Sequence, residues 1–271
     1  MNQPRVRRWS AGRARTLGTA TRGTTNPQRL RRNDRWICSS PQIAAALSVA
    51  GALAIDLGYG ATPVTTIELC GRLSAVFPAV RVLGLEIDPE RVTAAQSVAD
   101  PPRLTFARGG FELAGQRPQL VRAMNVLRQY DEVAALQAWS TMIAGLGPAG
   151  VLVEGTCDEI GRICSWVLLD ASGPVSLTLA CSAAHLDHPR TLAERLPKAL
   201  IHHNVDGQPI AALLADLGRQ WDAAAPLAVY SARQRWMAAV AGLPARWSVL
   251  SSPKRHRLGE LTVPWPVVAP V

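Results

Sequence analysis

The chain has 271 residues, of which 48% are hydrophobic and 18% charged, and its mean hydropathy is +0.08. This composition predicts a globular protein with one large core, and it excludes a fibrous or wholly disordered chain. The net charge of +9 is unevenly placed, because residues 1–36 hold ten arginines and one acid while the remainder carries 19 basic and 19 acidic residues. The high pI therefore does not indicate a nucleic-acid-binding body.

The N-terminal part divides into two predicted segments. Residues 1–22 are rich in arginine, glycine, serine and threonine, which offer little surface to bury, so they are predicted to be a disordered arm. Residues 23–50 are predicted to form a helical segment, in which Asn26 caps a helix with Pro27 at its first position and residues 43–49 continue as a second helix or turn.

Residues 51–182 alternate short apolar runs with amphipathic stretches, the pattern of buried parallel strands joined by crossover helices. The sequence thus predicts an α/β fold with a doubly wound, mostly parallel sheet. The predicted strands are 52–57, 80–85, 104–107, 121–126 and 151–153, and the predicted helices are 63–77, 91–98 and 133–143.

The last part of the chain breaks this rhythm. Residues 164–169 and 175–181 flank a turn sequence and predict a β-hairpin at one edge of the sheet. Residues 183–271 are predicted to form a helical C-terminal cap, with helices at 191–201, 210–221 and 232–241 and a proline-rich tail from Leu261.

The apolar runs and the cysteines allow a prediction of the cellular compartment, of membrane contact and of metal binding. The longest apolar run, residues 43–55, is shorter than the ~20 residues that cross a bilayer, and no apolar stretch follows the early arginines as it would in an export signal. Five widely spaced cysteines without a C-x-x-C pair fit reduced thiols better than a disulfide framework or a zinc site. We therefore predict a cytoplasmic protein with no membrane contact and no metal.

The strongest functional signal is the segment Asp56-Leu-Gly58-Tyr-Gly60 at the end of the first predicted strand. Two glycines allow a tight turn against a ligand, and the helix that follows directs its N-terminal amides to the same crevice. Glu86 closes the second predicted strand, where a carboxylate can accept hydrogen bonds from ribose hydroxyls. Together these features predict a site for a nucleoside-type cofactor.

Four segments in this order resemble the class I S-adenosylmethionine-dependent methyltransferases. They are Asp56-Leu-Gly58-Tyr-Gly60, Leu85-Glu86-Ile-Asp88, the stretch 106–112 and the stretch 124–130. The resemblance covers roughly residues 50–155 and implies a Rossmann-like methyltransferase fold with S-adenosylmethionine as the cofactor. The short stretch between Val153 and Cys164 implies that the last strands differ from the family's seven-strand pattern.

The resemblance also implies which residues bind the cofactor: Asp56, Gly58, Tyr59, Gly60, Glu86, Ile87, Gly110, Phe111 and Asn125. The same fingerprint could hold a dinucleotide. Against NAD, Pro63 occupies the last glycine position of G-x-G-x-x-G and prevents the close contact between helix and strand that glycine allows. The fourth segment also lacks the Asn/Asp-Pro-Pro-aromatic signature of amino-directed nucleic-acid methylases. The sequence therefore argues against methylation of the amino group of a nucleic-acid base.

Candidates for catalysis are Asn125, which the resemblance places beside the sulfonium, and His202 or His203 as a proton acceptor. Adjacent histidines on a helix diverge by ~100°, so at most one of them can face a given site. Asn125 could instead only fix a loop through its side chain, and a surface or capping role is the more common one for the histidines.

Candidates for substrate binding come from several segments. Arg29 and Arg32 belong to an arginine stripe that could clamp a carboxylate or phosphate, although such a stripe is usually a solvated face. Glu154 is expected near the open rim of the sheet, and Arg128 and Tyr130 lie in the fourth resembling segment.

The methyl acceptor is left open by the sequence. The neutral body and the capping helices favour a small molecule or a protein side chain, whereas the arginine-rich arm favours RNA. A third interpretation is a regulatory protein that binds the cofactor without turnover.

Overall fold

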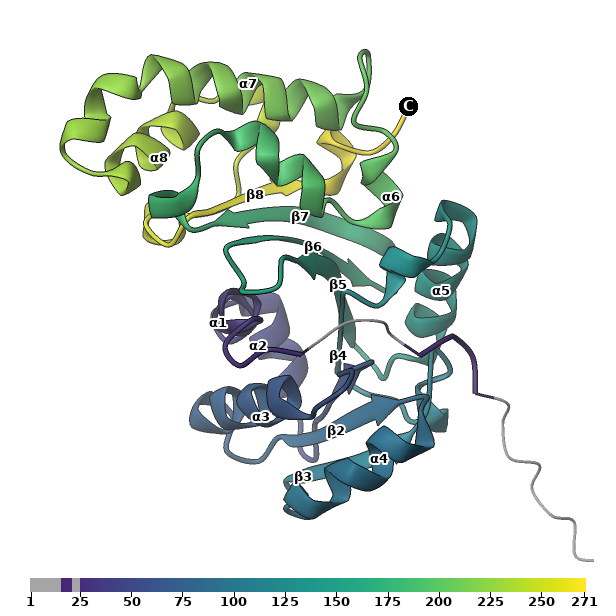
Figure 1. The fold of residues 1–271 in the computed structure, drawn as a ribbon. Coiled ribbons are helices and arrows are strands. Elements are labelled where there is room, and N and C mark those ends of the chain that lie inside the picture. The colour runs from purple at the N-terminus through teal and green to yellow at the C-terminus, as the bar shows by residue number, and fades with distance from the viewer. Residues whose placement is uncertain (1–15, 21–24) are drawn as a thin grey trace, which may run out of the picture.

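The computed structural model describes residues 16–20 and 25–271 and contains one sheet in the order β3-β2-β1-β4-β5-β6-β7-β8 (Figure 1). Strands β1 to β5 are parallel, and β6, β7 and β8 each run antiparallel to the preceding neighbour. The predicted doubly wound α/β fold is thereby confirmed. The strands are β1 Leu53–Leu57, β2 Arg81–Glu86, β3 Leu104–Arg108, β4 Leu120–Met124, β5 Val151–Cys157, β6 Ile163–Asp170, β7 Gly173–Cys181 and β8 Glu260–Pro264.

Helices cover both faces of the parallel half. On one face lie α1 (Arg31–Ile37), α2 (Pro41–Leu47), α3 (Val64–Val76) and α4 (Pro89–Ala95), and on the other lies α5 (Glu132–Gly145). Helix α3 buries Thr66, Leu69 and Leu73 at helical spacing, and Asp131 caps α5 by accepting from the Ala134 amide. Apolar faces of this period explain why these crossover helices were predicted from the sequence.

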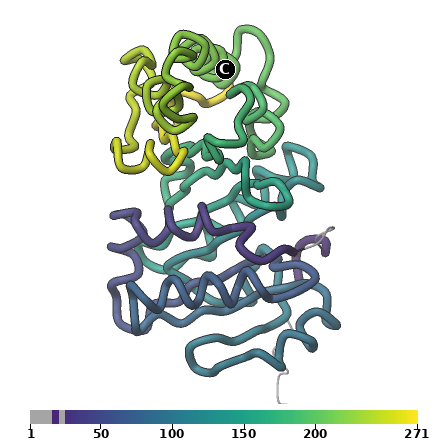
Figure 2. The backbone as a smooth tube through the Cα atoms, turned by 60° about the vertical axis from the view of Figure 1, so that its left-hand side comes forward, coloured from purple at the N-terminus to yellow at the C-terminus, as the bar shows by residue number. Residues whose placement is uncertain are grey.

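The antiparallel half carries the cap. Helices α6 (Lys198–Ile201), α7 (Pro209–Ala223) and α8 (Ala232–Ala241) share a core with the α5 face, while α9 (Pro253–His256) precedes β8 (Figures 1 and 2). The predicted helix 191–201 is instead a 3₁₀ segment, Pro189–Arg195, followed by α6, since Pro197 cannot donate an amide in a continuous helix. Among the described residues, no helix combines the length and apolar character of a membrane span.

Two sequence predictions for the chain ends are corrected. The predicted hairpin β6–β7 forms at the antiparallel side of the sheet, and the tail from Leu261, predicted without a strand, includes β8, which pairs with β7. Leu261 and Val263 are fully or almost fully buried at a spacing of two, a pattern that is hard to recognise in a strand of five residues that ends at Pro264. The first helix begins at Arg31, and the Asn26 side chain donates to the Glu159 carbonyl at 2.9 Å instead of capping it.

Part of the predicted arm lies on the body. Residues 1–15 and 21–24 fall outside the described residues. Leu17 donates its amide to Glu112 at 2.7 Å and accepts from the Phe111 amide at 3.0 Å, and the Thr19 amide donates to the Tyr130 hydroxyl at 2.5 Å. Residues 16–20 therefore form a strap across the ends of the strands rather than a free extension.

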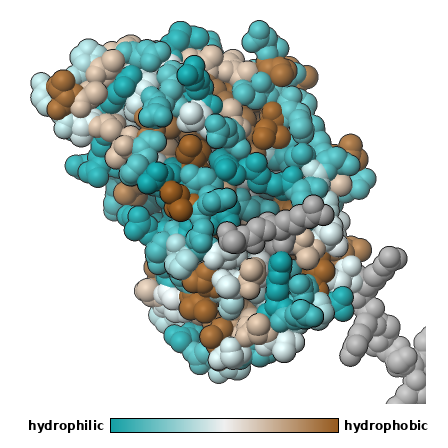
Figure 3. Space-filling view, in the orientation of Figure 1, coloured by the Kyte–Doolittle hydropathy of each residue, from teal (hydrophilic) through white to brown (hydrophobic). Residues whose placement is uncertain are grey.

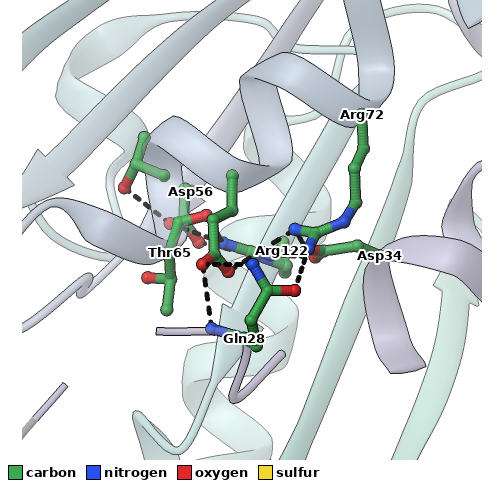
Figure 4. A network of polar contacts seen from close by, with 8 residues as sticks. Gln28, Asp34, Asp56, Thr65, Arg72 and Arg122 are labelled. Carbon is green, nitrogen blue, oxygen red and sulfur yellow. Dashed lines mark hydrogen bonds and ion pairs between the residues drawn. The ribbon is translucent and has the colours of Figure 1, made fainter. Parts of the chain in front are cut away.

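A buried ionic network joins α1 to the sheet (Figure 4). Arg122, on β4 and fully buried, donates to Asp56 through Nε at 2.8 Å and Nη2 at 2.7 Å, and its Nη1 contacts Asp34 on α1. Arg72 on α3 donates to the second oxygen of Asp34 at 2.6 Å, and Thr66 donates to Asp56 at 2.7 Å. Every carboxylate oxygen in this network therefore has a charged or hydroxyl partner.

We predict that Arg122→Met destabilises the protein by about 3–5 kcal/mol, because it leaves the buried carboxylates of Asp34 and Asp56 without their shared cation. The matched control, Arg103→Met, breaks the exposed pair with Asp100 and should leave the stability almost unchanged, because solvent screens that pair. Urea unfolding of both variants measures the difference. Equal losses would contradict the central role of Arg122.

Candidate functional site

The candidate site lies where the strand order reverses. Strand β1 pairs with β2 on one side and β4 on the other, so the loops after these strands diverge and leave a crevice at their carboxyl ends. The lining of this pocket comes from the ends of β1 and β2, the loops after β1 to β4 and the strap, and it consists of Thr19, Leu57, Gly58, Glu86, Ile87, Gly109, Gly110, Phe111, Val126 and Tyr130. The structure thus brings Gly58, Glu86, Ile87, Gly110, Phe111 and Tyr130 together around one pocket.

The glycine turn and Glu86 form one unit. Gly58 and Gly60 have φ of +68° and +84°, a conformation that residues with a Cβ rarely adopt. This turn directs the Gly60 amide to Glu86, which accepts from it at 2.9 Å through Oε2 and from the Ile87 amide at 2.9 Å through Oε1. Arg91 lies 3.6 Å from the same carboxylate. The Asp88 amide also donates to Oε1 at 3.5 Å, so these contacts together fix Glu86 in position.

Apolar side chains form the walls of the pocket, and the strap lies against them. A Cβ built on Gly18 would be 3.0 Å from Ile87 Cδ1 and 3.4 Å from Phe111 Cε2. Phe111 and Tyr130 form an edge-to-face pair with ring centroids 5.5 Å apart. With the strap in place the cavity measures about 10 Å³, so a cofactor of nucleoside size requires the strap to move.

Four predicted cofactor residues are not part of the pocket lining: Asp56, Tyr59, Gly60 and Asn125. The Asp56 carboxylate faces α3 and is occupied by Arg122 and Thr66. Tyr59 is buried on the same face, where its ring packs edge-on against Phe106 and its hydroxyl donates to the Arg91 carbonyl at 3.3 Å. Both side chains support the glycine turn from the α3 side.

Asn125 links the ends of β4 and β5. It adopts φ of +63°, its Oδ1 accepts from the Cys157 amide at 2.9 Å, and its Nδ2 donates to Cys157 Sγ at 3.3 Å. Hydrogen bonding with Cys164, followed by the charge of Arg29 and the Asn125 amide, lowers the pKa of the buried Cys157 thiol to about 7 against the opposing effect of burial. Sequence reasoning missed this polarised thiol, because only the strand pairing brings Cys164 opposite Cys157. Among the described residues, no cluster of His, Cys, Asp and Glu could hold a metal ion.

The remaining candidates lie around the pocket at different depths. The His203 side chain is hydrogen-bonded to Glu132 at 2.7 Å, and Glu132 follows the pocket residue Tyr130 by two positions in the chain. His202 is exposed. Arg128 is exposed and donates to the Glu194 carbonyl at 3.3 Å. Only one of the two histidines therefore faces the neighbourhood of the site.

Arg29 and Arg32 hold loops together. Arg29 donates to the carbonyls of Asp158 at 2.8 Å and Cys157 at 3.2 Å, at the end of β5. Arg32 donates to the carbonyls of Gly161 at 3.1 Å and Leu258 at 2.8 Å. Both side chains thereby attach the N-terminal helical segment to the carboxyl edge of the sheet.

Glu154 differs from expectation. It lies in the middle of β5 rather than at the rim, is fully buried, and accepts from Trp139 Nε1 at 3.2 Å. Burial raises the pKa of its carboxyl to about 8, opposed only by this hydrogen bond. The residue is therefore neutral at pH 7.

No protein-family model and no curated protein matches the chain. Similar solved structures include magnesium protoporphyrin IX methyltransferase from Synechocystis PCC 6803 with bound SAH, at TM-score 0.36 and 20% identity over 47% of this chain and 54% of that chain. Human N-acetylserotonin methyltransferase in complex with SAM has a TM-score of 0.33 and 20% identity, over 45% of this chain and 33% of that chain. A pericyclic reaction enzyme has a TM-score of 0.34 and 19% identity, over 43% of this chain and 31% of that chain. The chain spans less than two thirds of the length of each of these proteins.

We predict that Glu154→Gln removes a pH dependence of stability. The folded protein keeps the Glu154 proton up to about pH 8, whereas the unfolded chain loses it above about 4.5, so the parent protein loses stability as pH rises between these values. Between these pH values, the free energy of unfolding of the variant should rise relative to that of the parent protein by about 1.4 kcal/mol per pH unit. Above about pH 8 the difference should stay constant. Urea unfolding from pH 5 to 9 measures this gain, and Glu194→Gln, at an exposed position, is the control. A constant difference across the series would contradict the buried neutral carboxyl.

Proposed function

We propose that this protein is an S-adenosylmethionine-dependent methyltransferase. The observation that carries the proposal is the fixed carboxylate of Glu86, which lies beside the Gly58–Gly60 turn and between apolar walls at the point where the strand order reverses. A carboxylate that accepts ribose hydroxyls and a narrow apolar slot for a base are what a nucleoside requires.

The pocket residues fit this cofactor with separate roles. Glu86 would bind the ribose, Ile87 and Phe111 would enclose the adenine, and the Phe111 amide, which donates to the Leu17 carbonyl of the strap at 3.0 Å, would become available to the cofactor when the strap moves. A Cβ at Gly110 would lie 1.9 Å from the Leu17 carbonyl oxygen, so glycine is needed for the close approach of another segment there.

When bound, the cofactor supplies a methyl group already activated by its sulfonium. The chain's own residues have to orient an acceptor and exclude water. We propose that Asn125 contributes by fixing the loop after β4 through Cys157, because both polar atoms of its side chain are used there. His203, polarised by Glu132, is our candidate proton acceptor.

For the acceptor we favour a small molecule or a protein side chain over RNA. Hydrophilic residues dominate the face shown in Figure 3, and its hydrophobic residues form only small scattered groups. Outside residues 1–36 the chain carries 19 basic and 19 acidic residues, so the body has no net charge along which an extended RNA would bind.

We predict that isothermal calorimetry detects binding of S-adenosylhomocysteine, and that Glu86→Gln weakens it by about 1–3 kcal/mol through the lost charge-assisted contact. Glu90→Gln, an identical change at an exposed position on α4, should leave the affinity unchanged. Tight binding of NAD with no response to S-adenosylhomocysteine would overturn the proposed function.

We also predict that removal of residues 1–22 raises the affinity for S-adenosylhomocysteine several-fold, because the hydrogen bonds of Leu17 and Thr19 across the pocket need no longer be broken. Tyr130→Phe, which removes only the hydroxyl that accepts from Thr19, should shift the affinity in the same direction by less. A lower affinity of the truncated chain would show that the strap closes over the cofactor instead of competing with it.

A further inference from the structure

A second cavity lies beside α1 on the same edge of the sheet as the candidate site. It measures about 470 Å³, and a neighbouring one of about 250 Å³ shares Arg31, Arg32 and Ser182 with it. We call the two together the arginine trough. Its walls are α1, the β5–β6 turn, the end of β7, the start of α8 and the turn before β8 (Figure 1).

The trough has a strong excess of positive charge. Six guanidinium groups line it, those of Arg31, Arg32, Arg35, Arg162, Arg233 and Arg257. The lining carboxylate is Glu260, which is buried and already paired with Arg255 at 2.5 and 2.6 Å. Among the described residues, Arg31, Arg35, Arg162, Arg233 and Arg257 have no carboxylate within ion-pair distance.

The charges are assembled by the fold. Helix α1 buries Asp34, Trp36 and Ile37, which leaves Arg31 and Arg35 one turn apart on the exposed face. Arg32 spans the trough, since it donates to Gly161 on one wall and to Leu258 on the other. Like charges one turn apart on a helix are unfavourable, so this arrangement gains stability when an anion binds.

We propose that the arginine trough binds a small molecule that carries two or more phosphate or carboxylate groups. Guanidinium groups bind both anions through paired N–H donors. The volumes suit a small ligand rather than an extended strand, because ligand pockets typically measure about 300–1,000 Å³. If the proposed function holds, this ligand is the anionic part of the methyl acceptor, because both cavities open on the carboxyl edge of the sheet.

The test is calorimetry of the full chain with inorganic triphosphate, citrate and a mixed-sequence 20-nucleotide RNA. We expect triphosphate or citrate to bind, and the stronger of the two identifies phosphate or carboxylate as the recognised group. Arg35→Gln with Arg257→Gln, one from each wall, should weaken that binding at least tenfold. The control pair Arg117→Gln with Arg190→Gln, both exposed and outside the trough, should not.

Several results would overturn the proposal. These are no binding of either small anion, equal losses in the trough and control variants, or RNA binding that is stronger than triphosphate binding and falls steeply with salt. Binding of S-adenosylhomocysteine by the trough variant, measured in parallel, should equal that of the parent. If the parent protein does not bind S-adenosylhomocysteine, the proposed function is refuted. The proposal that the trough binds anions is not affected by that result.

Discussion

The bidentate contact between Arg122 and Asp56, extended to Asp34, is the interaction on which the rest of the structure depends. It lies inside the protein, where removal of one partner leaves the others as buried charges without compensation. Through Asp56 it fixes the strand that ends in the glycine turn, and through Asp34 it fixes α1. One cation thus positions both the cofactor pocket and the helix that carries Arg31 and Arg35.

The carboxyl edge of the sheet serves two purposes along its length. At the β1–β4 end, glycines and Glu86 create a narrow pocket with apolar walls. The strap lies against these walls. At the β6–β8 end, arginines from four separate segments create a wide cationic trough. Arg29 lies between them and holds the end of β5. A ligand with an apolar reacting part and an anionic part would match this polarity.

The antiparallel half gives the protein its individual shape. Because β6 returns directly beside β5 and β8 adds a further strand, the cap helices α7 and α8 lie beyond β7 and β8 and share the core of the α5 face (Figure 1). The turn before β8 and the start of α8 both contribute to the trough. The departure from a purely parallel sheet and the presence of the trough therefore have the same structural origin.

The sequence by itself determined the elements whose signals are local: the five parallel strands, the crossover helices, the β6–β7 hairpin, the glycine turn and Glu86. Tertiary structure alone decided which way individual side chains face. Asp56 looks like a cofactor ligand by position, but its carboxylate is taken by Arg122, 66 residues away. Glu154 is buried and neutral, and β8 exists only because β7 offers an unpaired edge. Such choices depend on contacts between residues distant in the chain, which no local period encodes.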